Sequence, residues 1–215
     1  MLTTTSTPVT APNLDFAELA GEEQIQRAAE ALEAHSIHTL VASNAEEARR
    51  LFFELVPDGS EVFLGASKTL QDLGITAEID KSGRFNALRP KMFAMNRETQ
   101  GKEIRKLGAS PDIAAGSVQA VTEDGQVLIA SNTGSQIGPY AAGAGKVIWV
   151  VGAQKIVRDL DEGMRRIDEY CLPLEDERMR QAVKVGTHLR KILIVKEEMR
   201  PDRTTLIIVK EKLGF

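Results

Sequence analysis

The segment GASKT, at residues 65–69, combines a glycine, two hydroxyl side chains and a lysine directly after the apolar run VFL. A strand that turns into a helix leaves backbone N–H groups unpaired at the helix N-terminus, and such groups bind anions. Open α/β sheets also bind ligands at the carboxyl ends of their strands. The predicted ligand-binding residues are Gly65, Ser67, Lys68 and Thr69. The alternative is that Ser67 only caps the helix.

A second polar segment, SNTGSQ, follows the apolar run VLIA. Its consecutive small or hydrogen-bonding side chains exceed what one helix cap requires, and loops on a rigid scaffold often carry function. We therefore expect a second site for an anion or carboxylate, with a plain loop as the alternative. The residues concerned are Ser131, Asn132, Thr133, Gly134 and Ser135.

Lys155 is a candidate for charge-pairing or catalytic chemistry. It follows the apolar run VIWVV and the turn GAQ. A lysine just past a buried strand faces the edge of the sheet, where its ammonium group can pair with a phosphate or carboxylate or, if desolvated, act as an acid or base. The alternative is a solvated lysine in a loop.

Strands and helices that alternate along the chain must position these residues, and this alternation is typical of βαβ units and a largely parallel sheet. Apolar residues at helical spacing begin at Ile25, and Ser43 or Asn44 can cap the next helix. Asp124-Gly125 between two apolar runs predicts a β-hairpin. Strands are expected at residues 38–42, 61–64 and 146–152, helices at 67–73, 97–107 and 160–171, and two strands joined by a turn at 200–202 near the end.

The polar segments lie just past, or between, predicted strands. Because the carboxyl ends of parallel strands share one edge of a sheet, we expect residues 65–69, Glu123, residues 131–135 and Lys155 to converge on one crevice. That crevice is the predicted binding site.

The chain has 215 residues, 42% hydrophobic and 27% charged, which suits a single α/β domain. Residues 1–13 are rich in Thr and Pro and are predicted to be a disordered tail, with the domain at residues 14–215. The net charge of -4 argues against nucleic acid or anionic membranes as partners, since both favour a basic surface.

The sequence predicts no cofactor and no metal. Cys171 is the single cysteine, so this chain cannot supply the thiolates of an iron–sulfur cluster, and it is expected to be buried in a helix. The three histidines lack metal-ligand spacing, and no GxGxxG supports NAD or FAD binding. Apolar runs are far shorter than the roughly 20 residues of a membrane span, and the start lacks a signal-peptide pattern, so a cytoplasmic location is expected.

Several of these motifs occur together in a known family. The run SNTGSQIGPYAAGAGKVIWVVGAQKIV, preceded by TEDG and by GASKTLQDLGI, resembles the LUD domain family, the YkgG-like lactate-utilisation proteins, over roughly residues 43–168. The resemblance implies a three-layer α/β fold like ribose-5-phosphate isomerase, glucosamine-6-phosphate deaminase (NagB) and the CoA transferases, with a mostly parallel sheet and helices on both faces. It also implies a role in the oxidation of lactate to pyruvate.

The same resemblance makes Glu123 a second catalytic candidate. In CoA transferases of similar fold, a glutamate near a strand turn is acylated as the nucleophile, and Glu123 in VTEDG occupies a comparable stretch. The alternative is a solvated turn residue of the hairpin.

Two functions remain open. In the first, the protein is an enzyme or enzyme subunit that binds a small anionic metabolite, either an organic acid, a sugar phosphate or a CoA ester. In the second, it is a non-catalytic assembly or ligand-sensing subunit that docks onto iron–sulfur and flavin subunits of a lactate-oxidising complex. The ligand, the partners and whether copies of the chain form a homo-oligomer are left undetermined by the sequence.

Overall fold

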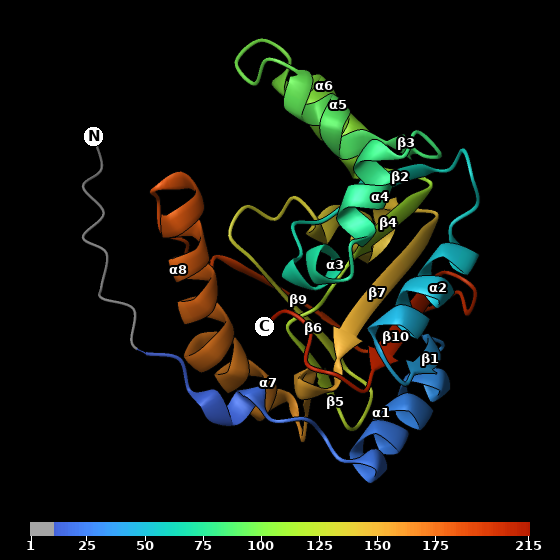
Figure 1. The fold of residues 1–215 in the computed structure, drawn as a ribbon, viewed down its shortest axis with the longest axis vertical. Helices are drawn as coiled ribbons and strands as arrows, with labels where there is room; N and C mark the ends of the chain where they lie inside the picture. The colour runs from blue at the N-terminus through green and yellow to red at the C-terminus, as the bar shows by residue number, and fades with distance from the viewer. Residues whose placement is uncertain (1–10) are drawn as a thin grey trace.

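A six-stranded sheet, parallel throughout, forms the centre of the molecule (Figure 1). The computed structural model describes residues 11–215. In spatial order the strands are β1 (His38–Ala42), β10 (Thr204–Val209), β7 (Lys146–Gly152), β4 (Ile113–Gly116), β2 (Glu61–Leu64) and β3 (Asn86–Ala87). The strands expected at residues 38–42, 61–64 and 146–152 are confirmed.

One face of this sheet is covered by helices α2 (Ala45–Leu55), α3 (Lys68–Asp72) and α4 (Ile75–Lys81). Their buried side chains include Phe52, Leu70 and Ile79, which belong to one apolar cluster with residues of β2, β4, β7 and β10. Asn44 caps α2, because its side-chain oxygen accepts a hydrogen bond from the Glu47 amide at 2.9 Å. Helix α3 ends before Gly74, whose φ of +68° is a left-handed conformation that favours glycine.

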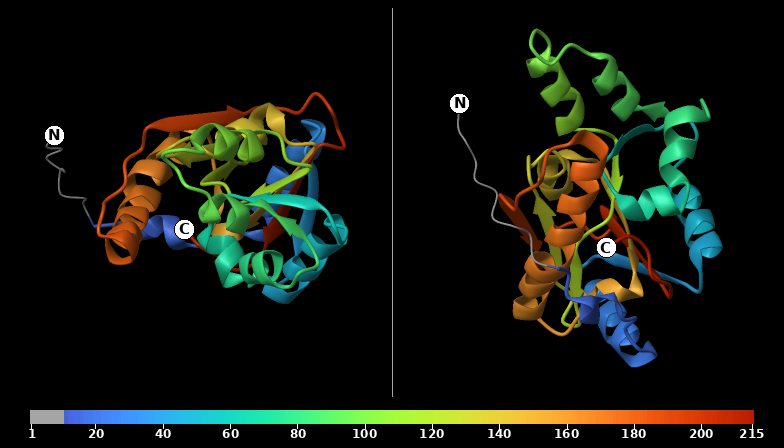
Figure 2. Two further views of the ribbon diagram at one scale, coloured as in Figure 1. Left: turned by 90° about the horizontal axis from the view of Figure 1, so that it is seen from above. Right: turned by 60° about the vertical axis from the view of Figure 1, so that its left-hand side comes forward.

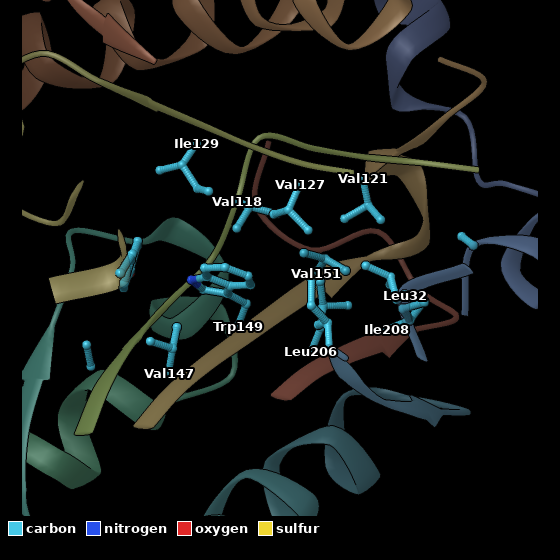
Figure 3. Close-up of a cluster of buried hydrophobic side chains, with 14 of the residues drawn as sticks. Leu32, Val118, Val121, Val127, Ile129, Val147, Trp149, Val151, Leu206 and Ile208 are labelled. Carbon is cyan, nitrogen blue, oxygen red and sulfur yellow. The ribbon is translucent and has the colours of Figure 1, made fainter. Parts of the chain in front are cut away.

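The other face packs against α1 (Glu22–Ala34) and against a second, smaller sheet (Figure 3). Val121, Val127 and Ile129 of the small sheet point toward Trp149 and Val151 of β7. The small sheet contains, in spatial order, β8 (Ile156–Val157), β5 (Ala120–Thr122), β6 (Val127–Ser131) and β9 (Lys191–Val195). Strands β5 and β6 are antiparallel, so the predicted hairpin is confirmed.

The outer face of the small sheet is covered by one long helical run. It comprises α7 (Leu160–Arg166), η4 (Ile167–Cys171) and α8 (Leu172–Val183). Ile167 packs against Ala120, Leu128 and Val157, and Cys171 is buried as expected. The run is longer than the helix predicted at residues 160–171, because Pro173 lies in the first turn of α8, where the missing N–H is tolerated.

Helices α5 (Leu88–Ala94) and α6 (Gly101–Ala109) project beyond the sheets (Figure 2). Helix α6 confirms the helix expected at residues 97–107, with a later start. The remaining turns are η1 (Leu14–Ala17), η2 (Pro139–Gly143) and η3 (Ala153–Lys155). Among the described residues, no helix is long and apolar enough to cross a membrane.

The two strands expected near the end, with a turn between them, are confirmed, and β9 joins the small sheet while β10 joins the large one. One detail differs from the sequence-based expectations. Asn13, placed in the predicted tail, caps η1 and donates its backbone N–H to the Glu169 carbonyl at 2.9 Å. Residues 1–10 of that tail lie outside the described residues.

Candidate functional site

A cavity of about 260 Å³ lies at the carboxyl ends of three adjacent strands of the large sheet. Ser67 follows β2, Ser117 follows β4 and Lys155 follows β7, and all three line the cavity. The loop after β6 and residues of α8 complete the lining. The predicted convergence of residues 65–69, residues 131–135 and Lys155 is therefore observed. Of the predicted ligand-binding residues, Ser67, Lys68, Thr69, Ser131, Asn132, Thr133 and Ser135 line the cavity.

The Lys155 side chain is 2% exposed and is held by two hydroxyl groups. Its Nζ donates hydrogen bonds to Thr69 Oγ1 at 3.1 Å and to Ser117 Oγ at 3.0 Å. Strand β7 ends at Gly152, which leads into the short turn η3. A Cβ at Gly152 would lie 2.5 Å from the Glu211 carbonyl oxygen and 2.6 Å from the Leu213 amide nitrogen, so this glycine lets the C-terminal segment pass close to the end of β7.

The electrostatic surroundings of Lys155 disfavour its charge. Burial, followed by the nearby Arg166 guanidinium, lowers the pKa of Lys155 to about 7. The other cationic residues of the lining are paired, Lys68 with Asp72 and Arg178 with Glu175. No ion pair involves Lys155 within residues 11–215. Since a buried charge is costly without a counter-charge, this amine is suited to meet an anion or to lose its proton.

Arg166 is a second buried cation, and it lies directly behind the cavity wall. Its guanidinium donates to the carbonyls of Gln154 and Gln119 and to Cys171 Sγ, the last at 2.9 Å. Nη2 is buried and has no hydrogen-bond partner in the described part of the chain. Burial is also the main cause that raises the pKa of the Cys171 thiol. Lys155 and Arg166 are thus two adjacent buried cationic residues, and neither forms an ion pair with a carboxylate among the described residues.

The loop after β6 presents hydroxyl and amide groups at the cavity. Ser131 is buried and orders the loop, since its Oγ accepts from the Gly134 amide at 2.8 Å and contacts Gln136 Oε1 at 3.0 Å. Gly134 itself does not line the cavity. Its φ is +86°, and a Cβ there would lie 2.8 Å from Lys191 Cδ, so it shapes the turn. Thr133 and Ser135 are exposed, so their hydroxyls can reach a ligand at the entrance.

The segment at residues 65–69 contributes differently from the expected helix N-terminus. Ser67 Oγ caps α3 by accepting from the Leu70 amide at 3.2 Å, which is the alternative role considered for it. Thr69 is buried and connects Lys155 to the Leu213 carbonyl. Gly65 lies outside the lining. A Cβ there would be 2.8 Å from the Tyr140 hydroxyl, so this glycine makes room for Tyr140.

Glu123 lies outside the cavity lining, contrary to the expectation that it shares the crevice. Its carboxylate accepts hydrogen bonds from Gln24 Nε2 at 2.9 Å and from Arg27 Nε at 2.7 Å. Burial acts to raise the pKa of Glu123, but the hydrogen bonds from Gln24 and Arg27 lower it below its ordinary value. The β5–β6 turn that carries Glu123 packs against α1, and this position explains the separation.

Four residues near the cavity were missed by the sequence analysis. Ser117 and Arg178 were hidden because a serine or arginine in an unremarkable loop or helix gives no local signal. Arg166 had a usable signal, because it falls between Met164 and Ile167 within an amphipathic helix. His188 is brought to the cavity by Asp176, which accepts the Thr187 amide hydrogen bond at 2.7 Å and fixes the loop after α8.

The arrangement contains nitrogen donors and hydroxyls but no evident metal-ligand set. Among the described residues, no group of three His, Cys, Asp or Glu side chains is placed to hold a metal ion. The chemical groups of the lining are hydroxyls, amides, the amines of Lys68 and Lys155, the His188 imidazole, the Arg178 guanidinium, the Cys171 thiol and the Glu175 carboxylate.

Comparisons with known proteins agree with the architecture. One solved structure, that of a DUF162 family protein from Deinococcus radiodurans, aligns with a TM-score of 0.54 and 12% sequence identity. The alignment covers 89% of this chain and 99% of that one, which supports the fold alone. No curated protein matches the sequence. The LUD domain family matches residues 25–209, which is most of the chain, and the protein therefore belongs to the LUD domain family.

Proposed function

We propose that this protein binds a small organic anion in the cavity at Lys155 and acts in the utilisation of lactate. Membership of the LUD domain family supports a role related to lactate utilisation. The observation that carries the proposal is the environment of Lys155. This residue is buried and lines the cavity, and its Nζ has only neutral hydroxyl partners. A bound carboxylate or phosphate would supply the missing counter-charge.

The size of the cavity narrows the choice of ligand. Pockets for drug-sized ligands usually have volumes of roughly 300–1,000 Å³, and the volume here is about 260 Å³. A three-carbon hydroxy or oxo acid fits this space, and a small sugar phosphate is the next candidate. A complete CoA ester is too large, so only its acyl end could enter.

The polar lining is suited to a hydroxy acid. Lys155 can bind the carboxylate or the substituent next to it, while Arg178 and His188 offer further N–H donors. The hydroxyls of Thr133 and Ser135 can donate to the remaining oxygen atoms. Because a site that hydrogen-bonds a substrate hydroxyl rejects analogues that lack it, this lining can distinguish lactate from propionate.

Oxidation of lactate to pyruvate removes two electrons, and these require an acceptor. A single cysteine cannot supply the four thiolates of an iron–sulfur cluster. We therefore propose that the chain works with iron–sulfur and flavin subunits of a lactate-oxidising complex. In that complex it supplies a binding site for the acid, either for catalysis or for sensing.

A ligand screen tests the binding proposal. Thermal shift and calorimetry would compare lactate, pyruvate and ribose 5-phosphate with lactamide, the neutral isostere of lactate. A ligand at about 100 times its Kd should stabilise the fold by about 2.7 kcal/mol. We expect lactate or pyruvate to stabilise and lactamide to have little effect. The proposal is wrong if no anion binds, or if lactamide binds as well as lactate.

A further inference from the structure

The hydrogen bonds around Lys155 fix which atoms donate and which accept. Thr69 Oγ1 donates its own proton to the Leu213 carbonyl at 3.2 Å, so toward Lys155 it must accept. Ser117 Oγ contacts the Val118 carbonyl at 3.5 Å and accepts from Lys155 in the same way. Two of the tetrahedral positions of Nζ are therefore occupied by N–H bonds that point to hydroxyl oxygens.

Lys155 lines the cavity together with Thr69 and Ser117, and we assign the remaining position of Nζ to the ligand bound there. In the ammonium form this position holds a third N–H, and in the amine form it holds the lone pair. Because the two hydroxyls consume both N–H bonds of the neutral amine, they orient the lone pair rather than compete with it. This is the geometry of a positioned nucleophile and not only that of a positive charge.

The surroundings keep the amine form accessible. Lys155 is buried beside the Arg166 guanidinium, and desolvation together with a neighbouring cation is a recognised way to activate a lysine for reaction with carbonyl groups. Lys68, the other lysine of the lining, differs in each respect. Its side chain is 44% exposed and is paired with Asp72.

We propose that Lys155 is a nucleophile that forms an imine with a small 2-oxo acid of the pyruvate class bound in this cavity. The inference rests on the proposed function, since it names the substrate class of the same site. It goes beyond charge pairing because it requires a carbonyl carbon next to the bound carboxylate.

The reaction balances without an oxidant or reductant. The Nζ lone pair forms a bond to the carbonyl carbon, and the C=O π electrons move to the oxygen. The nitrogen then loses one proton and the oxygen takes one up, which gives the neutral carbinolamine. A second proton converts the hydroxyl to water, which leaves with the C–O bonding electrons while the nitrogen lone pair forms the C=N bond of the protonated imine. Loss of the N–H proton from this imine returns the second proton. One amine and one carbonyl give one imine and one water.

Thr69 and Ser117 have distinct parts in this sequence. The protonated imine keeps one N–H, so one hydroxyl continues to accept from nitrogen while the other is released. Thr69 is held by its bond to the Leu213 carbonyl at 3.2 Å, whereas the Ser117 contact with Val118 is longer, at 3.5 Å. Ser117 is therefore the hydroxyl placed to relay the proton to the departing water.

Reductive trapping tests the inference on the full chain. The protein would be incubated with pyruvate and cyanoborohydride at neutral pH, and the site of the adduct located by peptide mass spectrometry. We expect one reduced pyruvate adduct per chain, on Lys155, and no adduct with lactate, which has no carbonyl group. Lys155→Arg should abolish the adduct, whereas the control Lys146→Met, at the exposed opposite end of β7, should retain it.

The outcomes separate this inference from the proposed function. If calorimetry shows that pyruvate and lactate bind but no adduct forms on Lys155, the imine is wrong and the anion site stands. If neither acid binds and no adduct forms, both proposals are wrong. Adducts spread over surface lysines at similar rates also overturn the imine. Because the wild-type peptide map locates the adduct by itself, the test does not depend on the folding of Lys155→Arg.

Discussion

Lys155 and Glu123 are both charged residues in turns beside strands, yet the fold treats them in opposite ways. The Glu123 side chain is 17% exposed and meets Arg27 and Gln24, which neutralise and hydrogen-bond its carboxylate. Lys155 is 2% exposed and meets only the hydroxyls of Thr69 and Ser117. The charge left without an opposite partner therefore marks the site, while the paired charge serves the packing of a hairpin on a helix.

The two environments also shift the two pKa values differently. The pKa of Glu123 moves away from neutral pH, and the pKa of Lys155 moves toward it. The hydrogen bonds from Gln24 and Arg27 outweigh burial and lower the pKa of Glu123, so it stays ionised. Burial and Arg166 bring the pKa of Lys155 to about 7. A group that exchanges its proton near neutral pH inside a cavity is a candidate for acid, base or nucleophilic chemistry.

The largest expected effect is on ligand affinity. Lys155→Met should weaken the binding of lactate or pyruvate by about 1.5–3 kcal/mol, or roughly 10- to 150-fold, because a charge-assisted hydrogen bond is lost. Glu123→Gln should leave the affinity unchanged, because its side chain lies outside the lining. Calorimetry on both variants measures the difference. If both variants lose the same affinity for the acid, the unpaired charge of Lys155 is not what distinguishes the binding site.

A second expected effect is the pH dependence of stability. The pKa of Lys155 is lowered from 10.5 to about 7 in the folded protein, so between these values the unfolded chain binds more protons. The free energy of unfolding of the wild type, relative to Lys155→Met, should therefore rise with pH above about 7. The slope approaches about 1.4 kcal/mol per pH unit.

Urea unfolding of the wild type and Lys155→Met at several pH values in this window gives that slope. Glu123→Gln is the matched control, since a carboxyl group with a lowered pKa contributes no slope above neutral pH. A flat difference between the wild type and Lys155→Met would mean that Lys155 keeps an ordinary pKa.

The elements that carry the site were accessible from sequence because each has a strong local signal. The apolar run of β7 and the Asp124-Gly125 turn fixed a strand and a hairpin. The gathering of Ser67 and Lys155 followed from one rule, that parallel strands share a carboxyl edge. Ser131 ends β6 of the small sheet, which pairs only antiparallel, so its place in the lining does not follow from that rule.

The rest of the site depends on contacts between distant segments, which no local pattern encodes. Glu123 was misplaced because the sequence does not indicate that Arg27, nearly a hundred residues earlier, packs beside it. Arg166 was not singled out from the sequence, although it is fully buried behind the cavity. A polar residue can occupy the buried face of a helix when carbonyls from other segments accept its N–H groups.

A smaller effect is expected for the stability conferred by Glu123. Glu123→Gln should lower the free energy of unfolding by about 0.5–1 kcal/mol at neutral pH, since its partner Arg27 is half exposed. Because the folded-state pKa of Glu123 is lowered, this contribution is present above about 4.5 and disappears as the pH falls further. Thermal melts at neutral and acidic pH check this, and a persistent difference at acidic pH would contradict the ion-pair explanation.

The smallest expected effect concerns Asn132 at the cavity entrance. Like the carboxylate of Glu123, and unlike the ammonium group of Lys155, its polar group is paired. Asn132 lines the cavity, but its Oδ1 accepts a hydrogen bond from Arg190 Nε at 3.0 Å, so its polar group already has a partner. Asn132→Ala should therefore change the affinity for lactate or pyruvate by at most about 0.5 kcal/mol, or roughly twofold, as is typical of an exposed contact. Calorimetry on Asn132→Ala and Lys155→Met under the same conditions compares the two losses of affinity. If Asn132→Ala weakens binding as much as Lys155→Met does, recognition depends on the loop after β6, and a buried charge without a partner is not what selects the ligand.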